Sequence, residues 1–263
     1  MISVEEAKDL VVKNSFQLPA TAKGISDCLN YVLSEDVLSP IFYPPFDQSA
    51  MDGFAMRFDD FKRQFPLEIA GESAAGIPFS GTLKAGQAVR IFTGAKVPAE
   101  ADTIVVQEKT FVEKGKLIIT DKLLEKGSNI RYKGHQTNKG DVILKKGQIM
   151  NPGAIGLLAS VGIITVKVYS SPKITLIVTG DELCKPGTSL TDGQVYESNS
   201  YSIHAALALV NCSQIEIVSV GDDEKKTIET LKYAFEKSDI VLVTGGMSIG
   251  KYDFVGNVMV RLG

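Results

Sequence analysis

The second half of this 263-residue chain constrains the fold most, because apolar strands and amphipathic helices alternate there in a regular pattern. The predicted strands are 173–178, 214–220 and 239–243, and the predicted helices are 198–210, 224–237 and 253–262. This alternation is typical of a parallel sheet that is covered by helices on both faces. Only three such strands are present, so we expect residues 171–263 to form an incomplete, truncated three-layer α/β/α domain.

The first half of the chain shows a different pattern of predicted helices and strands. Ser3 and Glu6 form a Ser-x-x-Glu pattern, which predicts a capped helix over 3–14, and a second short helix is predicted over 25–33. From residue 47 to residue 136, short β-prone runs alternate with turns and predict a mainly β domain. A helix starting at Asn151-Pro152 follows, so residues 1–46 with 137–170 are expected to form a mixed α/β linker domain. The fold class is thus multidomain α/β plus β.

Composition and charge exclude several function classes. The chain is 44% hydrophobic and 22% charged, as ordinary globular proteins are, and its net charge of −3 argues against nucleic-acid or anionic-membrane binding. Its three cysteines and two histidines show no spacing typical of a disulfide framework or a metal site. The uncharged run 148–166 is interrupted by Asn151-Pro152 and by glycines, so we expect a helix and a strand there. These features predict a soluble, cytoplasmic protein.

Polar residues follow each of the three predicted parallel strands. The three sets are Thr179-Gly180-Asp181-Glu182, Gly221-Asp222-Asp223, and the segment 244–253 with Gly245, Gly246, Ser248, Lys251 and Asp253. Ligands of open parallel sheets bind beyond the carboxyl ends of the strands. The two adjacent glycines allow close approach of the backbone, and a helix start after them favours an anion. The sequence therefore predicts a phosphate-binding site at this edge.

The carboxylates of Glu182, Asp222 and Asp253 fall at the same predicted edge. Two such charges about 4 Å apart repel by roughly 4 kcal/mol at an effective dielectric constant of about 20, so their convergence requires a cation. A Mg²⁺ ion held by oxygen ligands and bridging to a phosphate satisfies this requirement. The alternative is that Gly and Asp after a strand are ordinary turn and helix-cap residues.

The β-rich segment carries a second set of candidates. Asp52 lies in a small-residue stretch, Thr93 precedes a glycine at a strand end, and Arg131 precedes a glycine-containing turn. Arg131 is suited to bind a phosphate or oxyanion with two parallel hydrogen bonds. The alternatives are an Asx-turn for Asp52 and a solvated basic turn for Arg131.

These motifs together resemble the MoeA family, which includes the E domain of gephyrin. The resemblance rests on Ser49 to Ala55, Thr93-Gly94-Ala95, Asn129-Ile130-Arg131, the TGDEL stretch at 179–183, Gly193-Gln194-x-Tyr196 with Ser198-Asn199, and the GGMSIGKYD stretch at 245–253. The matches occur in order and cover nearly the whole chain. Each motif is weak by itself, whereas the combination is highly specific.

The resemblance implies molybdopterin molybdenumtransferase activity, in which Mg²⁺-dependent reaction of adenylylated molybdopterin with molybdate releases AMP and molybdenum cofactor. It also implies a homodimer, with the linker region as the dimerisation domain and with active sites shared between subunits. By position, Thr179, Glu182, Asp222, Gly245, Gly246, Ser248 and Asp253 would line the pterin-phosphate and metal side. Asp52, Thr93 and Arg131 would come from the partner subunit.

The chain departs from the family pattern in two places. His135-Gln136 stands where the family has an acidic pair, and the family's continuation beyond the third helix of the α/β part is absent. Two other functions share parts of the pattern. One is the related molybdopterin adenylyltransferase, whose α/β domain normally stands alone, and the other is a gephyrin-like scaffold without catalysis.

Overall fold

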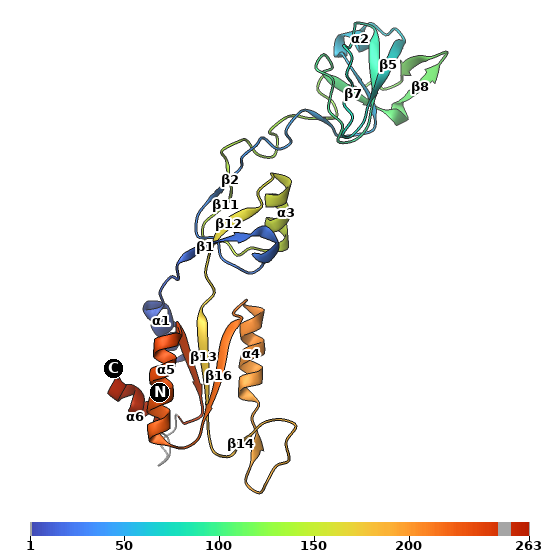
Figure 1. Ribbon diagram of the computed structural model, residues 1–263. Coiled ribbons are helices and arrows are strands. Elements are labelled where there is room, and N and C mark those ends of the chain that lie inside the picture. Colours follow the sequence, from blue (N-terminus) through green and yellow to red (C-terminus); the bar gives the residue numbers. More distant parts are fainter. Residues whose placement is uncertain (1, 247–253, 263) are drawn as a thin grey trace. The chain divides into compact units, whose positions relative to one another are not determined.

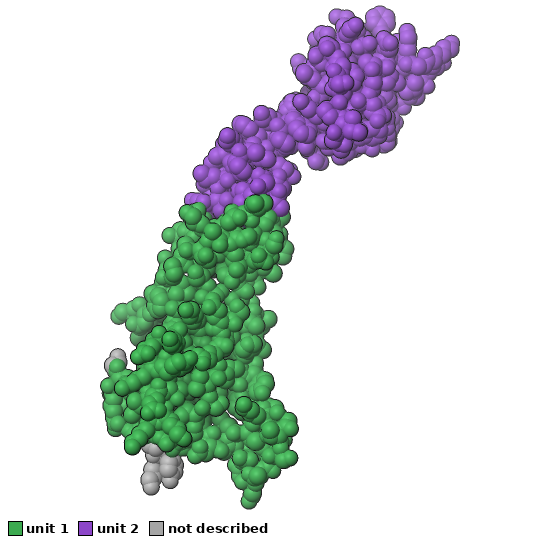
Figure 2. Space-filling model, in the orientation of Figure 1, with its two compact units in different colours: residues 1–35, 146–156, 164–263 green, residues 36–145, 157–163 purple. Residues whose placement is uncertain are grey.

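The computed structural model describes residues 2–246 and 254–262 and divides into two compact units. Figure 2 colours unit 1 green (residues 1–35, 146–156 and 164–263) and unit 2 purple (residues 36–145 and 157–163). The two units thus alternate along the sequence, with three segments in unit 1 and two segments in unit 2.

Unit 1 contains a three-stranded parallel sheet made of β13 (Lys173–Thr179), β16 (Gln214–Val220) and β17 (Ile240–Thr244). The strand order is β16-β13-β17, and the three predicted strands are confirmed. Val178 pairs with Ser219 on one side and with Thr244 on the other, so all three strands end at the same edge. That edge carries the predicted strand-end residues.

Helices lie on both faces of this sheet. Figure 1 shows α4 (Asn199–Leu209) on one face and α5 (Glu224–Lys237) with α6 (Phe254–Leu262) on the other. The α5–α6 side holds a buried apolar cluster that includes Ile177, Leu231 and Val258. The central strand β13 is buried from Ile174 to Thr179 because both faces are covered.

The rest of unit 1 begins with α1 (Val4–Asn14), whose Ser3–Glu6 capping box is present as predicted. Strand β1 (Ala20–Gly24) pairs antiparallel with β12 (Thr165–Tyr169). Helix α3 (Pro152–Ser160), of which residues 152–156 belong to unit 1 and the rest to unit 2, starts where Asn151 Oδ1 accepts a hydrogen bond from the Ala154 N–H. The uncharged run 148–166 therefore forms a helix and a strand. No helix among the described residues has the length and apolar character needed to cross a membrane.

The predicted helix over 25–33 is wrong. Only one 3₁₀ turn forms there, η1 (Ile25–Asp27), and Asn30 then adopts a left-handed conformation with φ of 64°. The N–H of Asn30 donates to the carbonyl of Met150, and the N–H of Leu33 donates to that of Gln148. These long-range bonds satisfy the backbone groups that a helix would have used.

Unit 2 is dominated by a six-stranded sheet in the order β7-β4-β6-β5-β9-β8. Its strands are β4 (Gly53–Met56), β5 (Leu67–Ser73), β6 (Gln87–Ile91), β7 (Thr103–Val106), β8 (Thr110–Glu113) and β9 (Lys116–Ile119). Two buried clusters pack on this sheet, one around Met56 and one around Ile104. A hairpin turn at 113–116 joins β8 to β9.

The remaining elements of unit 2 are short. They are α2 (Phe58–Lys62), η2 (Gln107–Lys109), the pair β2 (Val37–Leu38) with β11 (Val142–Leu144), and the pair β3 (Gln48–Ser49) with β10 (Ile130–Arg131). The β3–β10 pair matters for function because it joins two of the motif-bearing segments.

Candidate functional site

The end of β13 packs against the turn that follows β17. Thr179 is 6% exposed, and its hydroxyl donates to the carbonyl of Thr244 at 3.5 Å. Gly245 and Gly246 have φ of 89° and 63°, a left-handed conformation that favours glycine. A Cβ atom at Gly245 would lie 2.4 Å from the Thr179 carbonyl oxygen. Glycine is therefore required at Gly245 for the close approach of the two strand ends.

The end of β13 also lies close to the end of β16. The N–H of Asp222 donates to Asp181 Oδ1 at 3.2 Å, and a Cβ atom at Gly221 would lie 2.3 Å from that same oxygen. The carboxylate of Glu182 folds back over Gly180, where an added Cβ would meet it at 2.6 Å. The structure thus brings Thr179, Glu182, Asp222, Gly245 and Gly246 to one edge of the sheet, as the strand order requires.

The predicted metal ligands are Glu182, Asp222 and Asp253, and Asp253 and Ser248 lie outside the described residues. Among the residues that are described, no group of three His, Cys, Asp or Glu side chains is arranged to hold a metal ion. The donor chemistry at this edge nevertheless fits a hard cation, because it consists of exposed carboxylates. The three-carboxylate magnesium site stays a prediction.

Asp223 agrees with the alternative interpretation, in which an Asp after a strand is a turn or helix-cap residue. Its carboxylate caps α5 by accepting hydrogen bonds from the N–H groups of Lys225 and Lys226 at 2.9 and 3.1 Å. These backbone hydrogen bonds, the one from Lys226 first, hold the pKa of Asp223 below its ordinary value. Asp223 is therefore a helix cap, which separates it from Asp222.

In unit 2, three separate segments of the chain meet beside the six-stranded sheet. The N–H of Gly94 donates to the carbonyl of Ser49, and the N–H of Ala50 donates to the carbonyl of Asn129. Ser49 also pairs with Ile130, which places Arg131 opposite Gln48. The motif segments around 49–52, 93–95 and 129–131 therefore run side by side, although up to 80 residues separate them in the sequence.

Asp52 and Thr93 form the best-defined polar contact in this group. The backbone N–H and the hydroxyl of Thr93 both donate to Asp52 Oδ1 at 2.7 Å. The two hydrogen bonds hold the pKa of Asp52 below its ordinary value, so the carboxylate is ionised at neutral pH. Because Oδ1 accepts both hydrogen bonds from Thr93, the Asp52 carboxylate is fixed in one orientation.

Arg131 is exposed, and no ion pair among the described residues includes it. On the adjacent segment, Lys96 pairs with Gln48, so two cationic residues flank Gln48 from the two sides. The neighbouring Lys133 differs, because its N–H donates to Asp47 Oδ1 and its ammonium lies 4.7 Å from the ring centre of Phe42. The Lys133 ammonium therefore packs on an aromatic ring, whereas no such ring contact or ion pair involves Arg131 among the described residues.

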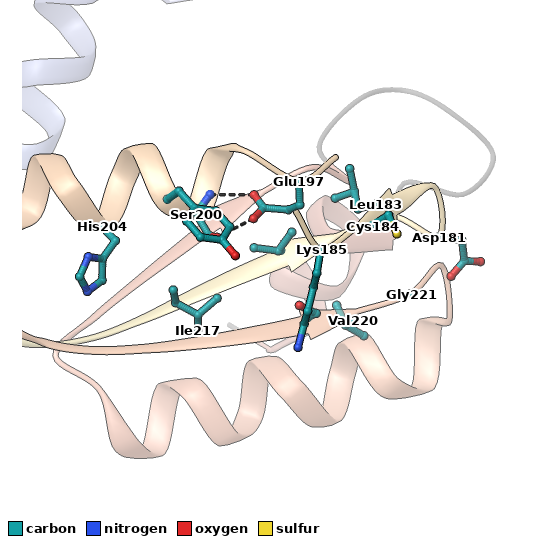
Figure 3. A pocket seen from close by; sticks show the side chains of 14 residues that line it. Asp181, Leu183, Cys184, Lys185, Glu197, Ser200, His204, Ile217, Val220 and Gly221 are labelled. Carbon is teal, nitrogen blue, oxygen red and sulfur yellow. Dashed lines mark hydrogen bonds between the residues drawn. The ribbon is translucent and has the colours of Figure 1, made fainter. Parts of the chain in front are cut away.

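Sequence reasoning missed a cleft of about 690 Å³ between α4 and the β13–β16 face. Figure 3 shows Ile217 on the floor of this cleft, with His204 and Glu197 on the helix side. Glu197 accepts hydrogen bonds from the Ser200 N–H at 2.7 Å and from the Ser200 hydroxyl at 2.5 Å. The order of Glu197 and Ser200 is the reverse of a capping box, so no capping motif in the sequence marked this contact.

The wall of the cleft nearest the strand ends is a short loop. It contains the parallel pair β14 (Leu183–Cys184) and β15 (Val195–Tyr196). The hydroxyl of Tyr196 donates to the carbonyl of Thr188 at 2.8 Å, which closes the loop on itself. Lys185 projects from this loop and lines the cleft.

The chain is thus an α/β protein whose glycine turns and carboxylates lie at the strand ends, which is where ligands bind in open parallel sheets. The sequence profile of the MoeA N-terminal region (domain I and II) matches residues 2–162, and that of a probable molybdopterin binding domain matches residues 175–263. The chain belongs to the MoeA family, whose fold of mixed α/β content with a curled β-sheet it shares.

Named relatives agree with this assignment. The molybdopterin molybdenumtransferase of Haemophilus influenzae is 34% identical over the whole chain, and that of Staphylococcus aureus is 36% identical over 98% of it. The chain spans 65% and 62% of the lengths of these two proteins. A crystal structure of the molybdopterin biosynthesis MoeA protein from Pyrococcus horikoshii superposes with a TM-score of 0.84 and 29% identity, covering 93% of this chain and 66% of that one.

Proposed function

We propose that this protein works in molybdenum cofactor biosynthesis as a molybdopterin molybdenumtransferase. The observation that carries the proposal is the convergence of Thr179, Gly221 and Gly245 at one sheet edge. That edge lies in the part of the chain matched by the molybdopterin binding domain. The activity that the curated relatives are named for supports the same reading.

The strand ends bind the phosphate end of adenylylated molybdopterin. The turn at Gly245 and Gly246 brings backbone within reach of a ligand because no side chain stands in the way. Ser248 adds a hydroxyl donor next to it in the sequence. An anion at the start of α6 is favoured by roughly 0.3–1 kcal/mol through the helix dipole.

Glu182, Asp222 and Asp253 would hold Mg²⁺, which when bound would supply positive charge against the phosphate oxygens. Glu182 and Asp222 both follow strands at this edge, and the register of β13 with β16 supports their proximity. The carboxylates would orient the cation, and Thr179 holds the turn after β17 through its hydrogen bond to the Thr244 carbonyl.

Asp52, Thr93 and Arg131 form the second half of the site, contributed by the other subunit of a homodimer. Arg131 binds the incoming molybdate, because a guanidinium matches the geometry of an oxyanion. Asp52 is ionised and fixed by Thr93, so it is suited to accept hydrogen bonds from the substrate. Water adds across the phosphoanhydride bond between the molybdopterin phosphate and AMP, so AMP leaves. The two thiol groups of molybdopterin bind molybdenum, and their protons leave with one oxygen of molybdate as water.

The same proposal includes a finer division of the chain. Residues 1–46 with 137–170 form the linker and dimerisation domain, 47–136 the mainly β domain, and 171–263 the molybdopterin-binding α/β/α domain. The protein acts in the cytoplasm without nucleic-acid or membrane partners. The boundary near residue 171 is supported by the gap between the two matched profiles, which falls at residues 163–174.

The direct test supplies the gene product with adenylylated molybdopterin, molybdate and Mg²⁺, and measures AMP release and cofactor formation. Glu182→Gln should lower the rate by about 100-fold or more, since it removes a charged group at the reacting phosphate. Glu236→Gln, an exposed change on α5, is the matched control and should leave the rate unchanged. Production of adenylylated molybdopterin from ATP would instead identify an adenylyltransferase, and neither activity would favour a scaffold.

The shared site is tested by mixing two inactive variants, Asp52→Ala and Asp253→Ala. If each site takes one residue from each subunit, a mixed dimer regains one intact site. Random exchange then restores roughly a quarter of the wild-type rate, because half of the dimers are mixed and each has one intact site of two. Absence of recovery after proven subunit exchange would contradict sharing.

A further inference from the structure

We propose that Arg90 is a positioning residue of the half-site formed by Asp52 and Thr93, because its guanidinium contacts each of the three chain segments that fix the Asp52 carboxylate. The inference rests on the proposed function, in which Asp52 accepts hydrogen bonds from the substrate, and it deepens that function. It adds a residue that belongs to neither of the two sets of site residues described above.

The guanidinium of Arg90 packs on two aromatic rings. Arg90 is in register with Phe54 on the neighbouring strand β4. Its carbon Cζ lies 4.9 Å from the ring centre of Phe54 and 5.2 Å from that of Phe92. Both distances are within the limit of about 6 Å for attraction between a cation and a ring. Phe54 is two residues after Asp52, and Phe92 directly precedes Thr93. The guanidinium therefore contacts both segments that form the Asp52–Thr93 hydrogen bonds.

The third contact of Arg90 leads to the backbone of Asp52. Arg90 Nη2 donates to Gln107 Oε1 at 2.6 Å, and the N–H of Gln107 donates to the carbonyl of Asp52 at 3.0 Å. Gln107 Nε2 donates to Glu108 Oε1 at 3.2 Å, so both ends of this side-chain amide have partners. Gln107 thus joins the guanidinium to the residue whose carboxylate it positions.

The charge of Arg90 acts on the same carboxylate. Two hydrogen bonds from Thr93 lower the pKa of Asp52 most, and the positive charge of Arg90 lowers this pKa further. Arg90 is partly buried, and no ion pair among the described residues includes it. A lysine carries the same charge but lacks the planar group that stacks on rings and donates in a fixed direction. If contacts as well as charge hold Asp52 in place, lysine cannot replace arginine here.

The Thr93 amide reports on this arrangement without any substrate. Its N–H donates to a charged oxygen at 2.7 Å, and such a short bond moves an amide proton signal to low field. In the isotope-labelled gene product at neutral pH, Arg90→Gln should move the Thr93 signal to higher field, because the carboxylate is no longer held. Arg90→Lys should move the signal nearly as far. Full recovery of the wild-type signal in Arg90→Lys would overturn the proposal, because charge alone would then suffice.

Two further variants separate positioning from folding. Gln107→Leu keeps the guanidinium and both rings but removes the acceptor, so the Thr93 signal should move in the same direction by a smaller amount. Arg57→Gln is the matched control, because Arg57 precedes α2 in the same unit and takes part in no ion pair or ring contact within the described part of the chain. It should leave the signal in place. An unchanged Thr93 signal in Gln107→Leu and in folded Arg90→Gln would also overturn the proposal.

The rate of AMP release tests the consequence for the reaction. Arg90→Gln should lower kcat about 10-fold and change KM by less than about 2-fold, since a misplaced group slows the reaction while the strand-end residues that bind the phosphate are unchanged. Arg57→Gln should keep the wild-type kcat.

The two measurements distinguish this inference from the proposed function. If the wild-type gene product releases no AMP, the proposed function fails, and the Thr93 signal still decides whether Arg90 positions Asp52. If the wild type is active and Arg90→Gln keeps its kcat, the proposed function stands and the positioning role is overturned.

Discussion

The two large sheets of this chain differ in how well their edge strands are covered. In the six-stranded sheet, the edge strand β7 is covered by a separate segment, because the Ile104 N–H donates to the Ser128 carbonyl and the Asn129 amide donates to the Ile104 carbonyl. In the parallel sheet, β17 pairs only with β13 among the described residues. Ile104 is fully buried, whereas Ile240 is 42% exposed.

This difference shows that burial depends on the place of a strand in its sheet as well as on its sequence. Residues 240–244 read Ile-Val-Leu-Val-Thr, yet every one of them keeps some exposure. Residues 53–56 of β4 include a glycine and an alanine, and all four are buried because strands flank β4 on both sides. Substitutions in β4 should therefore cost more stability than substitutions in β17.

The largest effect is expected at Gly53 in β4. A Cβ atom there would lie 1.9 Å from the carbonyl oxygen of Val105, so β4 and β7 would have to separate. Gly53→Ala should cost more than about 4 kcal/mol of unfolding free energy, measured by urea unfolding. Gly256→Ala in α6 meets no atom within 4 Å and should stabilise the chain by up to about 1 kcal/mol. A similar loss of unfolding free energy in both variants would contradict this prediction.

A second prediction uses two leucines that are paired in register across neighbouring strands. Leu176 in β13 is fully buried and Leu242 in β17 is half-buried. Leu176→Ala should lower the free energy of unfolding by about 3–5 kcal/mol. Leu242→Ala should lower it by about 1 kcal/mol, because the Leu242 side chain buries less apolar surface. Both losses of stability are measured by urea unfolding, with the NMR signals of the parallel sheet as the probe. Equal costs would mean that β17 is as well protected as β13.

Amide hydrogen exchange compares the two edge strands directly. Exchange in β17 should be roughly 10-fold or more faster than in β7, because β7 is covered and β17 is not. The experiment uses the 263-residue chain at neutral pH. Equal protection of Val105 and Val241 would show that the three-stranded sheet needs no cover at this edge.

The smallest effect is expected at Asp102, which joins β7 to α2. Its carboxylate accepts hydrogen bonds from the Phe58 N–H at 2.7 Å and from the Thr103 hydroxyl at 3.1 Å, and it lies 3.2 Å from the Lys126 ammonium. Burial raises the pKa of Asp102, but these contacts outweigh burial and hold the pKa below its ordinary value.

A lowered pKa in the folded state means that the Asp102 contribution is present above the unfolded pKa of about 3.9 and is lost as the pH falls toward the folded value. Asp102→Asn should cost about 1 kcal/mol at pH 7, because the site is partly exposed. The difference from wild type should shrink as the pH is lowered below about 4. A difference that stays constant down to pH 2.5 would show that the charge is not the cause.

Most of the α/β alternation was predictable, because apolar strands and amphipathic helices have different periods. The capped helices at Ser3 and Asn151 were predictable as well, since side chains next to them in the sequence form the caps. The segment 25–33 was not predictable in this way. Its conformation depends on hydrogen bonds to Gln148 and Met150, which lie more than a hundred residues away in the sequence.

The candidate site was predictable where a strand end carries it. Thr179, Asp222 and Gly245 lie at the ends of three strands whose parallel order places them together. The Glu197 cleft was not predictable, because it depends on how α4 lies over β16 and on which carboxylate oxygens Ser200 occupies. The contact of Asp52 with Thr93 likewise joins residues that are 41 positions apart.

The central claim is that molybdopterin binds at the strand ends of the parallel sheet, and an NMR titration of the isotope-labelled gene product with molybdopterin tests it most directly. The account predicts that the amide signals of Thr179, Gly221 and Gly245 shift in a saturable way, while those of the β8–β9 hairpin stay in place. A titration that saturates without moving these three signals would contradict the account.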